Sequence, residues 1–329
     1  MDRRSFLRSA GTAAAVAAGA AAGPACAREN KTLPPDAVGL LFDSTLCVGC
    51  KACVAACKDA NGMPPEPGAG TDGALWDSPL DISGRTLNVI KVYRHGNAQQ
   101  KDRAENGFAF VKKSCLHCVD PSCVSACPVS AMIKDAKTGV VSYDKDACIG
   151  CRYCVAACPF GVPRFTYDTP FPQISKCQLC QHRWADGKYA ACAEVCPTGA
   201  TLYGTVAELK QEIARRRALE PGTPTDYPRG RVGGPDASAP GVAASYVDHV
   251  YGEKELGGTQ LMMLSGVPFD KLGYPTLPER SYAADSETVQ ATLYGGMVLP
   301  FAFLGGLTWL ARRNVKNDEH ADEGDHDGE

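Results

Sequence analysis

Residues 47–57 read CVGCKACVAAC, and residues 148–158 repeat the same spacing as CIGCRYCVAAC. In both stretches, two residues separate neighbours among the first three cysteines, and three residues separate the third from the fourth. This is the bacterial spacing for a cubane [4Fe-4S] cluster, in which three closely spaced thiolates wrap one cube and the fourth points toward a neighbouring cluster. The repeated spacing therefore predicts at least two such clusters.

Two further blocks vary this spacing. The four blocks are Cys47, Cys50, Cys53 and Cys57; Cys115, Cys118, Cys123 and Cys127; Cys148, Cys151, Cys154 and Cys158; and Cys177, Cys180, Cys192 and Cys196. Proline follows the last cysteine in three blocks, as this motif expects, whereas Lys58 follows it in the first. Four complete blocks predict four [4Fe-4S] clusters, with these sixteen cysteines as the iron ligands.

Other uses of cysteine suit the spacing less well. Structural zinc needs two well-separated pairs, and a disulfide framework does not explain four crowded blocks. Covalent haem needs a histidine after the second cysteine, where Val119 and Gln181 stand. Because every block has its cysteines, we expect His117 and His182 to form hydrogen bonds or lie on the surface.

Composition narrows the function further. The chain has 329 residues, 44% of them hydrophobic, and a formal net charge of -3, which allows about two domains. A charge near zero gives no electrostatic basis for binding nucleic acid. We find no Ser/His/Asp or Cys/His nucleophile pattern, so we expect no catalytic site in this chain.

The two ends of the chain indicate where the protein works. Residues 1–27 combine Arg3 and Arg4 with an Ala/Gly-rich stretch, which predicts a twin-arginine signal peptide cleaved after Ala27. Cleavage removes Cys26, the only cysteine outside the blocks.

Near the other end, residues 289–312 predict one transmembrane helix, because Ala291 to Ala311 carries no charge and reaches about 32 Å as a helix. Basic residues follow the run, so the positive-inside rule puts the acidic tail, 313–329, in the cytoplasm. We therefore expect a single-pass protein on the periplasmic side of the inner membrane.

Residues 28–218 hold all four blocks and predict an α+β domain of two ferredoxin-like units. Residues 131–143 read as a hairpin, residues 87–93 and 108–111 as strands, and residues 260–264 as an edge strand. Thr205 and Glu208 predict a capping box opening a helix. We expect its basic residues, Arg216 among them, to lie on a solvated face. Residues 219–288 predict a Pro/Gly-rich linker and C-terminal extension.

The chain resembles HybA-type iron-sulfur subunits of hydrogenase-2. The resemblance is carried by residues 43–50 (DSTLCVGC), 106–108, 115–121 (CLHCVDP), 252–255 and 257–260. The cysteine blocks are also similar to those in the iron-sulfur subunits of formate dehydrogenase and dimethyl sulfoxide reductase. The blocks thus indicate the cofactor more strongly than the partner.

The resemblance implies electron transfer between a periplasmic nickel-iron hydrogenase, with its small and large subunits, and a membrane quinone-reactive subunit. It also implies nested ligation, whereas spacing alone leaves tandem pairing open. The implied ligand sets are Cys47, Cys50, Cys53 and Cys196 (set 1); Cys115, Cys118, Cys123 and Cys158 (set 2); Cys148, Cys151, Cys154 and Cys127 (set 3); and Cys177, Cys180, Cys192 and Cys57 (set 4). Lys51, Lys58, Lys113 and Arg152 stand where they could offset cluster charge.

Two other interpretations stay open on the sequence. The first is an iron-sulfur subunit of a molybdopterin enzyme such as formate dehydrogenase. The second is a structural adaptor whose redox-silent metals only hold the fold.

Overall fold

The computed structural model describes residues 28–64, 79–167, 169–234 and 238–322. The described chain forms two units, one of Asn30–Ala283 and one of residues 28–29 with 284–322. The proposed signal peptide, residues 1–27, and the last seven residues of the acidic tail lie outside the described residues.

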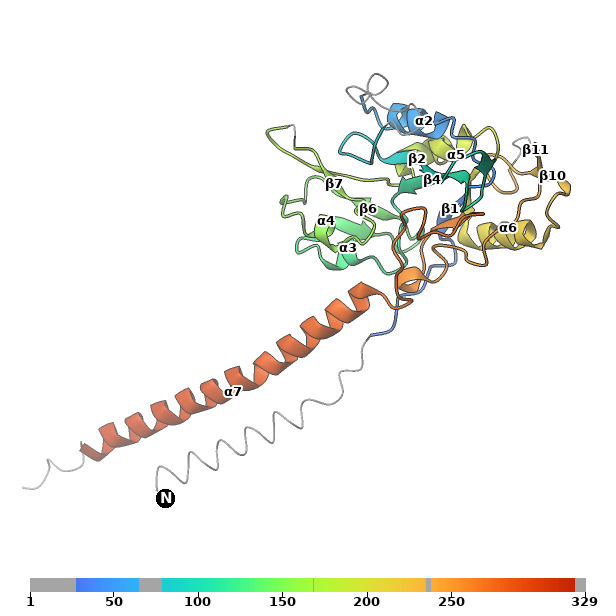
Figure 1. The fold of residues 1–329 in the computed structure, drawn as a ribbon. Helices are drawn as coiled ribbons and strands as arrows, with labels where there is room; N and C mark the ends of the chain where they lie inside the picture. The colour runs from blue at the N-terminus through green and yellow to red at the C-terminus, as the bar shows by residue number, and fades with distance from the viewer. Residues whose placement is uncertain (1–27, 65–78, 168, 235–237, 323–329) are drawn as a thin grey trace, which may run out of the picture. The chain divides into compact units, whose positions relative to one another are not determined.

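A three-stranded sheet forms the centre of the larger unit (Figure 1). Strand β1, Val38–Asp43, is the middle strand, with β9, Thr201–Thr205, antiparallel on one side and β12, Leu261–Leu264, parallel on the other. Strand β12 is the edge strand predicted at residues 260–264. A Cβ at Gly39 would lie 2.0 Å from the carbonyl oxygen of Gln260, so only glycine lets the chain approach this closely.

Helix α6, Val206–Ala218, packs on this sheet through Leu209 and Ile213, which are buried with strand residues such as Leu41. The predicted capping box is confirmed, because the Glu208 amide donates to Thr205 Oγ1 at 3.2 Å and the Thr205 amide donates to Glu208 Oε2 at 2.8 Å.

The expectation that Arg216 lies on a solvated face is wrong. Its side chain is fully buried, and its guanidinium donates to Asp43 Oδ2 at 2.9 Å and to Glu212 Oε1 at 2.7 Å. The guanidinium also lies 5.0 Å from the centre of the Tyr227 ring. Two carboxylates and an aromatic face thus compensate for the loss of water around this charge.

The remaining strands form small sheets. They are β2 (Asn88–Arg94), β4 (Gly107–Ser114) and β3 (Gln100–Lys101); β5 (Met132–Lys134) with β6 (Val141–Tyr143); β7 (Arg164–Phe165) with β8 (Ile174–Ser175); and β10 (Pro224–Tyr227) with β11 (Ala239–Val242). The predicted hairpin at 131–143 and the predicted strands at 87–93 and 108–111 are confirmed.

Short helices carry cysteines of all four blocks and meet in two pairs. Helix α2, Ala52–Ala60, contacts α5, Ala191–Glu194, and helix α3, Ser122–Ser125, contacts α4, Tyr153–Ala157. Figure 1 shows the two pairs in different parts of the larger unit. The fold therefore places block one against block four and block two against block three.

The segment after α6 is ordered along most of its length. Besides β10, β11 and β12 it contains a short 3-10 helix, Glu255–Gly257. Gln260 joins this segment to the domain that holds the cysteine blocks. Its side-chain Nε2 donates to the carbonyl oxygens of Val38 at 2.6 Å and Thr138 at 2.9 Å.

Helix α7, Tyr282–Asp322, contains Pro300. Its stretch Tyr282–Arg312 is long and apolar enough to cross a membrane, with a mean hydropathy of 1.5 in its most apolar window. Large apolar side chains such as Leu293, Phe301 and Trp309 are exposed. A helix of this kind in the predicted place agrees with a membrane anchor.

Candidate metal centres

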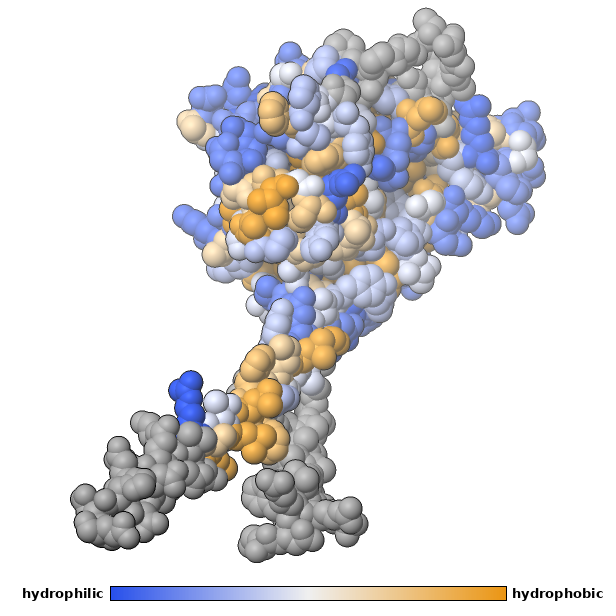
Figure 2. Space-filling view, turned by 90° about the vertical axis from the view of Figure 1, so that its left-hand side faces the viewer, coloured by the Kyte–Doolittle hydropathy of each residue, from blue (hydrophilic) through white to orange (hydrophobic). Residues whose placement is uncertain are grey.

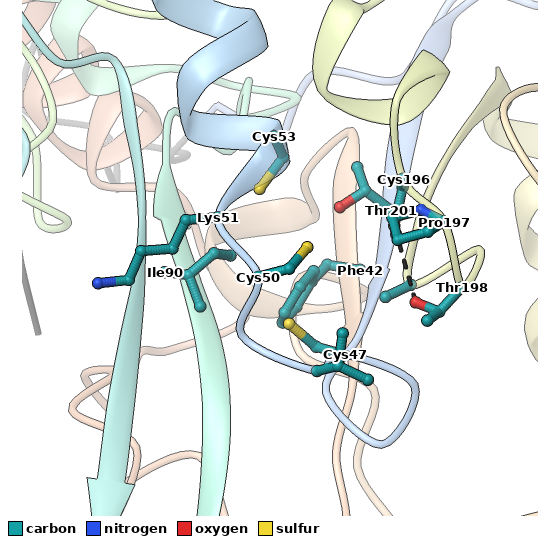
Figure 3. Close-up of a pocket in the computed structure, with 12 residues that line it drawn as sticks. Phe42, Cys47, Cys50, Lys51, Cys53, Ile90, Cys196, Pro197, Thr198 and Thr201 are labelled. Carbon is teal, nitrogen blue, oxygen red and sulfur yellow. Dashed lines mark hydrogen bonds between the residues drawn. The ribbon is translucent and has the colours of Figure 1, made fainter. Parts of the chain in front are cut away.

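Cys47, Cys50 and Cys53 share a pocket with Cys196, the last cysteine of block four. Figure 3 shows the first three side chains rising from one loop and the start of α2, with Cys196 across the gap. These are the four cysteines of set 1.

A second pocket gathers set 4. Its lining includes Cys57, Cys177, Cys180 and Cys192. Cys57 lies one helical turn after Cys53 on α2. Cys53 lines the first pocket and Cys57 lines the second. Block one thus contributes its fourth cysteine to the pocket of block four, and block four returns Cys196.

The same exchange relates blocks two and three. Burial raises the pKa of Cys118, and Cys123, Cys158 and Cys115 raise it further, which places the members of set 2 together. Burial likewise raises the pKa of Cys154 to about 11, with further contributions from the other members of set 3, which are Cys127, Cys148 and Cys151.

Cysteines of one set also interact with cysteines of the next set. Cys53 of set 1 interacts electrostatically with Cys192 of set 4. Cys177 of set 4 interacts with Cys115 of set 2. Cys123 of set 2 interacts with Cys154 of set 3. The sets are therefore neighbours in the order 1, 4, 2, 3.

Left-handed backbone conformations shape the loops. In blocks one and three the glycine before the second cysteine and the basic residue after it have positive φ: Gly49 at 70° and Lys51 at 60°, Gly150 at 72° and Arg152 at 63°. Such turns direct amides toward sulfur. The Gly150 amide donates to Cys148 Sγ at 3.4 Å, and the Thr201 amide donates to Cys196 Sγ at 3.3 Å.

The thiols fit metal ligation. Burial raises the pKa of Cys47 and that of Cys57 to about 12 each, so a bare thiolate is unfavourable in either place. A bound metal deprotonates its thiol ligands outright and supplies the missing positive charge. Amide donors to sulfur then stabilise the charged form.

Among the described residues, no three His, Cys, Asp or Glu side chains are close enough together to hold a single metal ion. Each of the two pockets instead has four cysteines among its lining residues, which is the number of thiolate ligands that an iron-sulfur cube takes.

The histidines behave as expected. His117 is buried and its Nδ1 accepts a hydrogen bond from the Val141 amide at 3.1 Å. A ring nitrogen of His182 lies 2.7 Å from the Ala60 carbonyl oxygen.

Of the basic residues expected near the clusters, Lys51 lines the set 1 pocket, and its side chain extends away from the four cysteines in Figure 3. The Lys58 ammonium donates to the Arg85 carbonyl oxygen at 2.6 Å, and that of Lys113 lies 3.0 Å from Asp81. Arg152 lies over the rings of Phe165 and Tyr167.

Sequence reasoning missed three lysines that lie close to the cysteines. Lys112 and Lys176 are buried, and Lys134 is partly buried. The Lys134 ammonium donates to the carbonyl oxygen of Cys118 at 2.8 Å. Lys112 and Lys113 are adjacent on one strand, and the sequence pattern does not say which of them faces inward.

Two 4Fe-4S dicluster domain models match the chain, one over residues 39–128 and one over residues 107–206. Hydrogenase-2 operon protein HybA of Escherichia coli O157:H7 is 46% identical over 331 residues, covering 99% of this chain and 100% of that protein. The protein of the same name from Shigella flexneri gives the same values. The formate dehydrogenase-O iron-sulfur subunit of Escherichia coli K12 is 36% identical over 181 residues, covering 55% of this chain and 57% of that subunit.

Proposed function

This chain belongs to the HybA family of iron-sulfur proteins, and on that premise we propose that it conducts electrons through four [4Fe-4S] clusters between a nickel-iron hydrogenase and a membrane quinone-reactive subunit. The chain itself is the electron-transfer subunit and the partner carries the catalytic site. The observation that carries the proposal is the arrangement of sixteen cysteines as four neighbouring sets. Such clusters accept and release single electrons over a wide range of potentials.

We assign ligation by set. The ligands are Cys47, Cys50, Cys53 and Cys196; Cys115, Cys118, Cys123 and Cys158; Cys148, Cys151, Cys154 and Cys127; and Cys177, Cys180, Cys192 and Cys57. The two shared pockets and the helix pairs α2 with α5 and α3 with α4 support this nested scheme over tandem pairing.

Sets 1 and 3 then form the ends of the electron path. Each has one exposed cysteine, Cys50 in set 1 and Cys151 in set 3. Val48 and Ile149, beside them in equivalent loop positions, are 52% and 66% exposed. Exposed apolar side chains next to a redox centre suit docking of another protein, because the contact excludes water and shortens the path.

Figure 2 shows apolar surface among polar neighbours on the face that carries α3, α4 and β7. Tyr153 and Tyr167, from this part of the chain, are 61% and 71% exposed. We assign this face, at set 3, to docking of one partner subunit, and the set 1 end to docking of the other.

We further propose export by the twin-arginine pathway, with α7 as a single membrane span and the tail in the cytoplasm. Arg3 and Arg4 precede the Ala/Gly-rich stretch, and basic residues follow the apolar part of α7.

An alternative partner is a formate dehydrogenase, for which this chain would be the iron-sulfur subunit. The observation in its favour is 36% identity to such a subunit. That likeness extends over about half of each chain, whereas the likeness to HybA extends over the full length. A structural role with redox-silent metal is the remaining alternative.

Anaerobic purification of the membrane complex tests the proposal. We expect about sixteen irons per mature chain, four for each four-cysteine set, and paramagnetic signals from interacting clusters after reduction. A nickel-iron subunit should copurify. Zinc as the main metal, or a molybdopterin subunit as the partner, would refute the assignment.

Pairing has its own test. Cys57→Ser should impair the set 4 cluster and leave set 1 with its four ligands, and Cys196→Ser should do the reverse. If Cys57→Ser instead impairs the set 1 cluster and Cys196→Ser the set 4 cluster, each cysteine serves the cluster of its own block and the nested pairing is wrong.

A further inference from the structure

Lys112 is a fully buried lysine in the wall of the set 4 pocket. Its relative exposure is 1%, and its ammonium donates to Asn88 Oδ1 at 3.2 Å. Within the described residues, no carboxylate forms an ion pair with it. A buried ammonium beside a neutral amide is costly, so another negative charge must compensate for it.

Thiolates supply that charge. The set 4 pocket contains Lys112 together with all of its cysteines, whereas the set 1 pocket does not include Lys112. Lys112 interacts electrostatically with Cys192, Cys57 and Cys177 of set 4 and also with Cys53 of set 1, so the lining of the two pockets is what distinguishes the sets.

The surrounding contacts hold Lys112 in place. The Tyr274 hydroxyl donates to its carbonyl oxygen. Asn88, which accepts the ammonium hydrogen bond, also donates to the Cys53 carbonyl oxygen at 3.3 Å. On the same strand, Lys113 points the other way and lies 3.0 Å from the exposed Asp81. The two neighbouring lysines therefore differ in burial and in partner.

We propose that Lys112 sets the relative reduction potentials of two clusters. Its fixed positive charge makes the set 4 cluster a more favourable site for an added electron than the set 1 cluster. The inference rests on the proposed four-cluster function. A charge in a poorly polarisable interior acts most strongly on its nearest neighbours, and charges near a cluster are one determinant of its potential.

The electron balance is simple. One electron leaves set 1 as one enters set 4, and Lys112 keeps its proton throughout, so no proton moves with the electron. Lys112 thus shifts the equilibrium of electron transfer between set 1 and set 4 toward set 4.

The test is a redox titration monitored by electron paramagnetic resonance on the iron-loaded full chain carrying Lys112→Gln. We expect the ratio of reduced to oxidised cluster at a fixed potential to fall at least tenfold for one cluster, equal to about 59 mV for one electron. Lys113→Gln is the matched control and should leave all ratios unchanged. Lys112→Arg, which keeps the charge, should restore the ratio.

Asn88→Asp keeps the lysine and puts a carboxylate beside it, so it should shift the same cluster in the same direction even if Lys112→Gln does not assemble. Iron content distinguishes a failure of the proposed four-cluster function from a failure of the role of Lys112. Fewer than four clusters in the unmodified chain would contradict the proposed function. Full iron with unchanged ratios in Lys112→Gln or Asn88→Asp, or an equal shift in Lys113→Gln, would overturn the role of Lys112.

Discussion

Replacing Arg216 with methionine should destabilise the larger unit strongly. Arg216 and Asp43 both have fully buried side chains, and that of Glu212 is 6% exposed. The substitution leaves both carboxylates without their buried cation. Breaking a buried ion pair from one side costs about 3–5 kcal/mol, because the remaining charge stays desolvated.

Arg217 provides a matched control one residue along α6. Its guanidinium pairs with Asp248, whose side chain is 99% exposed. Exposed pairs contribute about 0–1 kcal/mol, so Arg217→Met should change little. A second control combines Arg216→Met with Asp43→Asn, which removes one of the stranded charges and should recover part of the loss.

Cluster loss makes unfolding irreversible, so a rate is the appropriate measure. We would follow the visible absorbance of the clusters in urea under anaerobic conditions. If the whole penalty of about 3–5 kcal/mol falls on unfolding, Arg216→Met should lose its clusters about 10²- to 5 × 10³-fold faster.

The set 1 signal should disappear first. Arg216 contacts Asp43, which precedes Cys47 by four residues, and donates to the carbonyl oxygen of Gly199, which follows Cys196 by three. Equal loss rates for Arg216→Met and Arg217→Met would refute the reasoning.

Three further predictions concern local features. Thr205→Ala removes the acceptor in the α6 capping box and should cost about 1 kcal/mol, measured as faster cluster loss in urea, whereas Thr205→Ser should not. Gly39→Ala puts a methyl group 2.0 Å from the Gln260 carbonyl oxygen and should displace β12, while Gly295→Ala, which meets nothing within 4 Å, should be silent; equal proteolytic sensitivity of the two would contradict this. Arg3→Lys with Arg4→Lys should retain the iron-loaded protein in the cytoplasm, and ending the chain before Ser286 should release it from washed membranes; unchanged fractionation in either case would count against the leader or the anchor.

Features that depend on nearby residues could be predicted from the sequence. The hairpin at 131–143 and the capping box at Thr205 each need only a short stretch of chain, and both are present. The spacing within each cysteine block is equally local, so the cofactor class followed from it.

Features that depend on distant residues could not. Arg216 finds its buried partner 173 residues away, so the pattern of α6 alone placed it wrongly in solvent. Spacing likewise left open which blocks exchange cysteines, because that depends on α2 meeting α5. Lys112 and Lys113 differ only in which side of β4 faces the cysteines.

The central position of β1 has a consequence for synthesis of the chain. Leu40 of β1 pairs with Leu261 of β12, so the first strand to leave the ribosome waits for 221 more residues before its sheet can close. At translation rates of about 5–20 residues per second, the delay is about 10–45 s. Until β9 emerges, both edges of β1 are open to other chains, and the edge that β12 will cover stays open for the whole delay, which favours protection by a chaperone. Premature termination before β12 would leave the sheet unfinished, so only a polypeptide that includes β12 can reach the native state.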